Sequence, residues 1–269
     1  MAIAPIRRLP LHALLGLAIA AAGLLPQPAA AQTALDNIMK SGQIKVAIPT
    51  DYPPYGFVGT DMKPQGLDIE MAQLIGRKLG VKVELVTVTS ANRIPYLQTG
   101  KADIVISTLG RNAERLKVID FSRAYAPFFQ GVFAAKSLTI KDFADLAGKT
   151  IAVTRGAIED EELVKVGPPG MQLKRFEDNA ATIAAFMAGQ TQVIATSVSV
   201  AGTIMQRSPR LGTEYKLLLK DSPNFIGIAK GENALRDKVN EIIAAAGADG
   251  TLDTLSQKWL GRPAGDLPE

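Results

Sequence analysis

The sequence contains no cysteine, and its single histidine, His12, lies near the amino terminus. Without cysteine the chain forms no disulfide, has no thiol nucleophile and carries no lipid attached to a cysteine. Histidine is the commonest general base and a usual zinc ligand, so the rest of the chain lacks the residues most often used for catalysis and zinc binding. Carboxylate or lysine chemistry stays open, but the composition favours a protein that is not an enzyme and implies no cofactor.

An excess of one kind of charge is also missing. The 269 residues include 30 Lys and Arg and 26 Asp and Glu, which gives a formal net charge of +4. No run of five or more basic residues occurs. This balance does not produce the basic surface that nucleic acids require, so we expect no nucleic-acid partner.

The first 31 residues have the pattern of a removable export signal. Arg7 and Arg8 precede an apolar run at residues 11–25, and prolines and three alanines follow, up to Ala31. This order is typical of a secretory signal peptide, so we predict cleavage after Ala31 and a periplasmic protein. The alternative is a membrane anchor, but the apolar run is about 15 residues long and a spanning helix needs about 20.

The remaining residues, 32–269, alternate between two patterns. Apolar segments rich in β-branched residues, and one alternating segment, predict strands at 44–48, 81–88, 104–107, 131–135, 150–153, 172–176 and 192–196. Apolar residues spaced three and four apart predict helices at 67–79, 94–98, 140–146, 159–166, 179–188, 233–246 and 252–260. Such alternation is typical of an α/β protein with mixed, mainly parallel sheets flanked by helices.

The alternation runs through the chain twice, which predicts two lobes. We assign residues 32–129 and 223–269 to the first lobe and residues 130–222 to the second, with the C-terminal helices returning to the first. Ligands of open α/β sheets bind beyond the carboxyl ends of the strands. The loops at 49–55, 107–110, 155–157 and 196–197 leave those ends, so we predict a site in the cleft between the lobes.

Six motifs follow one another along the chain: VAIPTDYPPY (46–55), GLDIEMA (66–72), NRIPYLQTGKAD (92–103), ER followed by DFS (114–122), DLAGKTIAV (145–153) and KWLG (258–261). In this order they resemble the family-3 extracellular solute-binding proteins, the periplasmic receptors of polar amino acid ABC transporters. The resemblance implies a type II periplasmic-binding-protein fold that closes around a small carboxylate, such as a polar or acidic amino acid or a derivative. It also implies a monomer that delivers its ligand to an ABC permease in the inner membrane.

The resemblance assigns roles to residues of the first lobe. Arg115 matches the arginine that holds the ligand α-carboxylate, for which a planar, permanently charged fork is suited. Ser107 and Thr108 match positions that add donors to the same carboxylate, and Gly110 belongs to the same strand-end loop. The alternative for Arg115 is a surface salt bridge.

Two further pairs bear on the ligand side chain. Tyr52 and Tyr55 fall where the family places an aromatic wall, although ordinary loop packing would also explain them. Ser90 and Arg93 resemble the branch that binds glutamate and aspartate, in which they reach the side-chain carboxylate. The alternative for Arg93 is a structural role, and a second arginine of that branch, expected near Pro49, is absent.

In the second lobe, Gly156, Ala157 and Ile158 precede an acidic helix start. Free backbone N–H groups at such a position can hold a carboxylate. The family often has a threonine where this chain has Ile158, so only backbone contact is implied there.

Ser197 marks a departure from the family, which has an aspartate for the ligand ammonium group at this position. A hydroxyl cannot neutralise a desolvated ammonium ion, whose burial without a partner costs several kcal/mol. Either another acid takes this role, with Glu159, Asp160 and Asp178 as candidates, or the ligand lacks an α-amine.

Two other functions remain open at this point. A periplasmic dehydratase-like enzyme on the same fold would show a cleft carboxylate with a raised pKa. A stand-alone sensor module is less favoured, because no transmembrane or kinase region accompanies the two lobes in this sequence.

Overall fold

A computed structural model of the protein describes residue 1 and residues 33–268, and the predicted signal peptide falls on residues outside this part. Residues 33–268 form two five-stranded sheets, a small three-stranded sheet and flanking helices. The predicted α/β fold class is confirmed.

The first sheet and its helices make up what we call the first lobe. Its strand order is β5 (Lys82–Thr87), β1 (Gln43–Ile48), β6 (Ile104–Leu109), β13 (Asn224–Ala229) and β7 (Ile119–Ala126). The helices packed with it are α1 (Ala34–Ser41), α2 (Leu67–Leu79), α3 (Arg93–Gln98), α4 (Ala113–Val118), α8 (Asn233–Ala248) and α9 (Thr251–Leu260). The small sheet of β2 (Asp51–Tyr52), β3 (Gly56–Val58) and β4 (Pro64–Gln65) adjoins α2.

The second sheet and its helices make up the second lobe. Its strand order is β10 (Gln172–Phe176), β9 (Thr150–Thr154), β11 (Val193–Ser197), β8 (Phe129–Ala135) and β12 (Thr213–Asp221). The helices α5 (Ile158–Val166), α6 (Asn179–Met187) and α7 (Val198–Arg207) pack on it, and the short 3₁₀ helices η1 (Phe143–Leu146) and η2 (Pro209–Leu211) lie in its connections.

Both sheets are mixed. In the first, β1 is parallel to β5 and β6, whereas β13 is antiparallel to β6 and β7. In the second, β9 is parallel to β10 and β11, whereas β8 is antiparallel to β11 and β12. Parallel pairs are therefore half of the total rather than the predicted majority, because the strands that link the lobes run against their neighbours.

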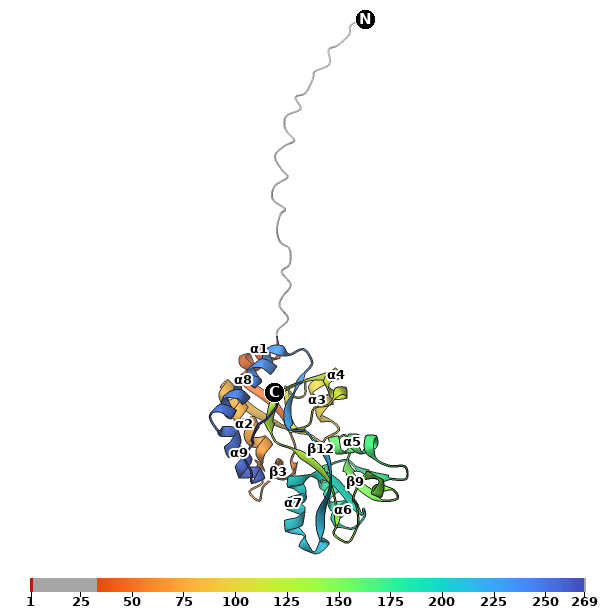
Figure 1. Ribbon diagram of the computed structural model, residues 1–269. Coiled ribbons are helices and arrows are strands. Elements are labelled where there is room, and N and C mark those ends of the chain that lie inside the picture. Colours follow the sequence, from red (N-terminus) through yellow and green to blue (C-terminus); the bar gives the residue numbers. More distant parts are fainter. Residues whose placement is uncertain (2–32, 269) are drawn as a thin grey trace. The chain divides into compact units, whose positions relative to one another are not determined.

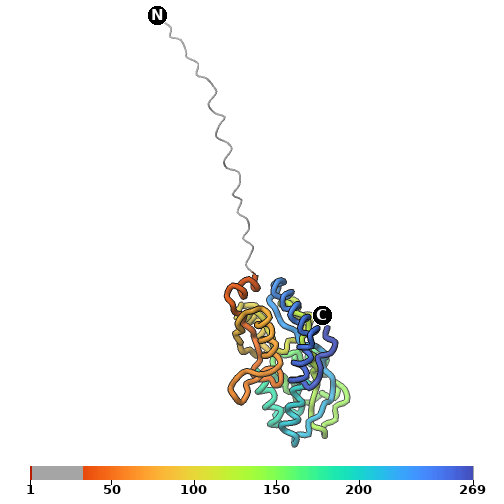
Figure 2. The backbone as a smooth tube through the Cα atoms, turned by 90° about the vertical axis from the view of Figure 1, so that its left-hand side faces the viewer, coloured from red at the N-terminus to blue at the C-terminus, as the bar shows by residue number. Residues whose placement is uncertain are grey.

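The chain passes between the lobes twice. Residues 127–128 link β7 to β8, and residues 222–223 link β12 to β13. The backbone N–H of Ser222 donates to the carbonyl of Phe128 at 3.1 Å, so the two links lie side by side. The C-terminal helices α8 and α9 then pack against α1 and α2, and Figures 1 and 2 show these blue and orange segments next to one another.

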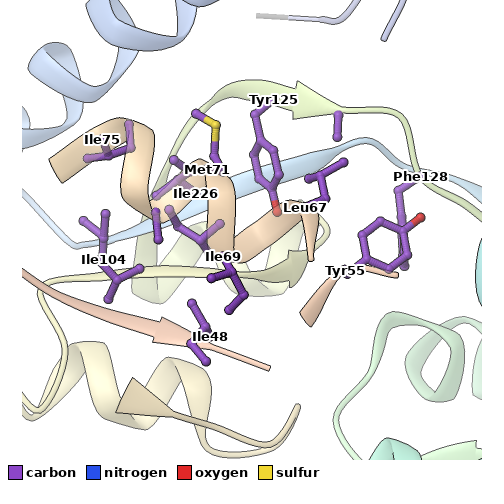
Figure 3. Close-up of a cluster of buried hydrophobic side chains, with 14 of the residues drawn as sticks. Ile48, Tyr55, Leu67, Ile69, Met71, Ile75, Ile104, Tyr125, Phe128 and Ile226 are labelled. Atoms are coloured by element: carbon purple, nitrogen blue, oxygen red, sulfur yellow. The ribbon is translucent and has the colours of Figure 1, made fainter. Parts of the chain in front are cut away.

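Helix α2 shows how the sequence sets an element and its buried face. It spans the predicted residues, and Gly80 ends it in the left-handed conformation at φ +72°. Met71 and Ile75 on its inner face lie in one fully buried cluster with Ile104 of β6 and Ile226 of β13 (Figure 3). This core fixes the strand ends from which the loops of the cleft emerge.

Several elements have no counterpart among the predicted segments, namely the helices α1, α4, α7 and η2 and the strands β2, β3, β4, β7, β12 and β13. The helix predicted at 140–146 is only the 3₁₀ turn η1. Strand β12 lacks simple alternation because its pairing with β8 shifts register twice. Strand β13 is buried along nearly its whole length, so it also lacks the alternation that marks a half-exposed strand.

Candidate ligand-binding site

A small cavity lies between the two lobes at the carboxyl ends of their strands. The first lobe supplies Tyr52, Ser90, Arg93, Thr108 and Phe128, and the second supplies Ala157, Ile158, Glu159 and Asn179. The cavity volume is about 10 Å³, roughly the room that one water molecule needs. A larger ligand therefore requires the lobes to move apart and close again.

Arg93, the first residue of α3, is only 2% exposed. Its guanidinium group donates to the carbonyls of Ser107 at 2.5 Å and Thr108 at 3.4 Å, and to the carbonyl of Gly156 in the second lobe at 3.3 Å. Burial, followed by the neighbouring charge of Arg115, lowers the pKa of Arg93 to about 9. Arg93 is thus a charged group in the cavity wall whose hydrogen bonds all go to backbone carbonyls, and the nearby carboxylates of Glu159 and Glu161 favour its charge.

Arg115 of α4 lies beside the cavity rather than in its wall. Its guanidinium group donates to the carbonyl of Gly110 at 2.9 Å, to that of Gly156 at 3.1 Å, and to the carboxylate of Glu161 at 2.8 Å. Its Nε has no hydrogen-bond partner within residues 33–268. Two buried guanidinium groups, those of Arg93 and Arg115, therefore converge on one carbonyl oxygen. An anionic oxygen at this point would form stronger, charge-assisted bonds with both.

The aromatic pair lies across the cleft from the second lobe. The Tyr52 hydroxyl accepts from the backbone N–H of Ser197 at 3.2 Å and is 3.0 Å from the hydroxyl of Thr196. Tyr55 stacks behind Tyr52 with ring centroids 5.8 Å apart. Its ring also meets that of Phe128 edge to face, with centroids 5.2 Å apart. Tyr52 lines the cavity, and Tyr55 supports it from behind.

A buried carboxylate holds the loop after β6 in place. Thr108 has φ +43°, an unfavourable conformation for a residue other than glycine, and its N–H donates to Asp68 at 3.0 Å. The hydroxyl of Tyr125 donates to the other Asp68 oxygen at 2.7 Å. Asp68 thereby fixes the backbone turn whose carbonyls, at Ser107 and Thr108, bind Arg93.

Asp51 joins the two lobes at one side of the cleft. Its carboxylate accepts from the backbone N–H groups of Asn179 at 2.8 Å and Ala180 at 3.1 Å, and from the Asn179 side chain at 3.0 Å. These groups form the N-terminus of α6, where the helix dipole favours a negative charge. The contact stabilises the closed arrangement of the lobes.

Gly156 brings the second lobe against the loop that carries Ser90. Its φ is +72°, and a Cβ atom there would lie 2.9 Å from Cα of Ala91. Glycine is therefore required twice, by the backbone conformation and by the close approach. Gly110 of the first lobe also packs closely against the second lobe, because a Cβ atom added to Gly110 would lie 2.7 Å from Cδ1 of Ile158.

We expect Gly156→Ala to weaken binding of the protein's best amino-acid ligand by about tenfold or more, because the added methyl group holds the lobes apart and the φ value alone costs roughly 1–2 kcal/mol. The matched control is Gly148→Ala, which has φ +70° but open space around the new Cβ. Calorimetric titration and thermal melting should show lost affinity only for Gly156→Ala and lowered stability for both. Equal affinities for the two variants would contradict the close approach.

The acids of the second lobe differ in their surroundings. Asp160 pairs with Arg175 at 2.8 Å, and Asp178 caps α6 by accepting from the N–H of Ala181 at 2.7 Å. Glu159 is 4% exposed, and its Oε1 has no hydrogen-bond partner in the described part of the chain. Burial raises the pKa of Glu159 to about 7.

Ser197 is fully buried, and its hydroxyl accepts from the N–H of Val200 at 3.2 Å as the N-cap of α7. Its side chain is therefore used within its own helix. The backbone N–H of Ser197 donates to the hydroxyl of Tyr52, which lines the cavity.

The structure brings the predicted site residues together in two layers. Those in the cavity wall are Tyr52, Ser90, Arg93, Thr108, Ala157 and Ile158. Those behind it are Tyr55, Ser107, Gly110, Arg115, Gly156 and Ser197. Phe128 and Asn179 were not foreseen as wall residues, although Asn179 follows a predicted strand end. Glu159 was considered only as a possible substitute for the missing aspartate.

Two buried carboxyl groups predict an unusual dependence of stability on pH. Burial raises the pKa of Asp68, as well as that of Glu159, to about 7, well above the ordinary range near 4. The folded state then binds protons more tightly than the unfolded state, so this contribution to stability is full below about pH 4 and is lost as the pH rises through 7.

We expect the free energy of unfolding of the ligand-free protein to increase between pH 8 and pH 5, by up to about 1.4 kcal/mol per pH unit for each group. Urea unfolding across this range measures it, and Glu159→Gln should flatten part of the slope. A free energy of unfolding that decreases toward acidic pH, to the same extent in the wild type and in Glu159→Gln, would contradict the burial of these two carboxyl groups.

Paired α/β lobes with charged groups in a closable cleft define a class of solute-binding proteins. Residues 44–262 match the model of the bacterial extracellular solute-binding proteins, family 3, and the chain belongs to this family. It is 27% identical to the L-cystine-binding protein TcyJ of Escherichia coli, over 89% of this chain and 91% of that protein. It is 26% identical to the L-glutamate/L-aspartate-binding protein of Pseudomonas aeruginosa, over 93% of this chain and 88% of that protein.

Solved structures agree with this assignment. An ancestral arginine-binding protein bound to arginine superimposes with a TM-score of 0.77 at 31% identity, covering 82% of this chain and 99% of that one. The ancestral amino acid-binding protein AncCDT-1, described as a precursor of cyclohexadienyl dehydratase, gives a TM-score of 0.74 at 32% identity, over 84% of this chain and 99% of that one. The chain is accordingly a family-3 solute-binding protein, and the relatives that it matches are binding proteins rather than enzymes.

Within residues 33–268 no three side chains of the types that ligate metals come together. Among the same residues, no helix has the length and apolar character to cross a bilayer.

Proposed function

We propose that the protein is the solute-binding component of an ABC importer and that its ligand is a small carboxylate, namely a polar or acidic amino acid or a derivative. The observation that carries this proposal is the convergence of the Arg93 and Arg115 guanidinium groups on one carbonyl oxygen between the lobes. Relatives named for binding cystine, glutamine, arginine, and glutamate with aspartate support the ligand class.

In this proposal ligand oxygens replace the carbonyl of Gly156 at both arginines. Arg115 holds the α-carboxylate, and Arg93, with Ser90, selects an acidic or polar side chain. Tyr52 forms the aromatic wall. The backbone at Ala157 and Ile158 closes from the second lobe.

The two lobes would open and close about the paired links at residues 127–128 and 222–223. We propose that the lobes comprise residues 32–129 with 223–269, and residues 130–222; β8 itself begins at Phe129, one residue before this boundary. Ligand binding favours the closed state, which the permease of the inner membrane recognises. The mature protein is a periplasmic monomer whose signal peptide is cleaved after Ala31.

A thermal-shift screen of the purified protein tests this function. A ligand that binds the folded state at 100 times its Kd adds about 2.7 kcal/mol of stability and raises the melting temperature. We expect a shift with one or a few polar or acidic amino acids. Mass spectrometry should recover the ligand unchanged after incubation. Absence of a shift with every amino acid and dicarboxylate would contradict the proposal.

A further inference from the structure

The cavity wall contains one buried cation and one buried anion. Arg93 and Glu159 are the two charged residues that line it, and they come from opposite lobes. Both side chains are at least nine-tenths buried. Arg93 has three backbone acceptors, but one carboxylate oxygen of Glu159 has no partner among the described residues.

Other carboxylates near the cleft are already engaged. Asp51 accepts from the N-terminus of α6, and Asp160 pairs with Arg175. Glu161 pairs with Arg115 and also accepts from Asn112 Nδ2 at 2.6 Å. Glu159 is the acid whose free oxygen remains available in the cavity wall.

An unpaired buried carboxylate is costly, so its retention needs an explanation. The groups that face Glu159 are Arg93, Arg115, Glu161, Tyr52 and Tyr55. The two arginines are not sufficient to compensate its burial, as the raised pKa of Glu159 indicates. A ligand cation placed in the cavity would supply the missing partner.

We propose that Glu159 accepts the α-ammonium group of the ligand in place of the strand-end residue Ser197, so that the site requires a zwitterion. This inference rests on the proposed function. The ligand then lies between two opposite charges, with its carboxylate toward the arginines and its ammonium group toward α5. A ligand without an amine would leave Glu159 unpaired after closure and would bind less tightly.

The test compares the wild type with Glu159→Gln. The matched control is Glu177→Gln, which removes the same charge from an exposed ion pair with Arg155. Calorimetric titration measures binding of L-glutamate, L-glutamine and L-arginine, each beside its amine-free analogue: glutarate, glutaramate and guanidinovalerate. Thermal melting verifies that every variant is folded.

We expect the wild type to prefer the amino acid over its analogue by about tenfold or more. Glu159→Gln should lose about 30-fold or more in affinity for the amino acid, the usual scale for removing one partner of a buried charge pair, and change little toward the analogue. Glu177→Gln should leave both affinities within about threefold. Amino-acid binding by Glu159→Gln within threefold of the wild type would overturn the inference while leaving the proposed function intact. Failure of the wild type to bind these six compounds and every other amino acid and dicarboxylate of the thermal-shift screen would contradict the proposed function itself.

A pH series and a second substitution sharpen the result. Because Glu159 must be ionised to attract the ammonium group, amino-acid affinity of the wild type should fall between pH 8 and pH 5, and that of Glu159→Gln should not. Ser197→Asp should not strengthen amino-acid binding, because Glu159 already supplies the ammonium site. A strong gain of amino-acid affinity in Ser197→Asp would overturn the assignment to Glu159.

Discussion

Replacing Arg115 with alanine is expected to weaken ligand binding by about 2–5 kcal/mol, the range measured when one partner of a buried charge pair is truncated. Arg115 is 4% exposed, and its guanidinium group joins the two lobes through the carbonyl of Gly110 and the carboxylate of Glu161. In the proposed complex it also forms a bidentate pair with the α-carboxylate. Its loss therefore removes both a ligand contact and a contact that favours closure.

Arg115→Lys should also bind poorly, because a single ammonium group cannot reproduce the planar fork. Arg210→Ala, at an exposed position of the second lobe, removes the same charge as the alanine variant and should change affinity little. Titration of all three variants with the amino acid that binds best measures the effect. Affinity within threefold of the wild type in Arg115→Ala would remove this residue from the site.

Arg93→Ala is the second substitution with a large expected effect. The change removes the Arg93 donor from the carbonyls of Ser107 and Thr108, whereas the carbonyl of Gly156 keeps its bond from Arg115. An unsatisfied buried polar group costs about 1–3 kcal/mol. The desolvation cost of Arg93 itself is relieved, so we expect a net loss of about 1–3 kcal/mol in the free energy of unfolding. Urea unfolding of the ligand-free protein measures this part.

The effect of Arg93→Ala on ligands should depend on their charge. If Arg93 reads a side-chain carboxylate, L-glutamate loses more affinity than L-glutamine, which has the same shape without the second negative charge. Equal losses for both would show that Arg93 has only the structural role of bracing the loop after β6. Binding of cationic ligands alone would contradict the preference for acidic ligands.

Sequence pattern predicted the parts of this fold that have strong local signals. Helix α2 was located from the spacing of its apolar residues and from Gly80 at its end. The lobes followed from two rounds of strand and helix alternation. The strands β12 and β13 were missed because register shifts and complete burial remove the alternation that marks a half-exposed strand.

The site residues also divide into those that local motifs predict and those whose role depends on contacts between distant parts of the chain. Tyr52 and Arg93 belong to motifs with a recognisable order, and the structure places both in the cavity wall. Glu159 has a common local explanation, since acidic residues in a first helical turn favour the helix dipole. Its significance depends on burial by the opposite lobe, which brings residues more than 60 positions away, such as Arg93, to the same cavity. Local pattern carries no information about such a contact.

Asp51 and Asp68 illustrate the same limit. Each lies in a motif, but its hydrogen-bond partners, Asn179 for Asp51 and Tyr125 for Asp68, are far away in the sequence. Asp51 joins the lobes, and Asp68 fixes the loop that holds Arg93. These supporting roles could be assigned only from the folded chain.

The central claim is that a small carboxylate binds between the lobes at the two arginines, and a crystal structure of the protein with its bound amino acid tests it most directly. The measured quantities are the distances from the ligand carboxylate oxygens to the guanidinium nitrogens of Arg93 and Arg115. We predict a charge-assisted pair with Arg115 at about 2.7–2.9 Å, with the ligand enclosed by both lobes. A ligand bound outside the cleft, or one whose carboxylate touches neither arginine, would contradict the account.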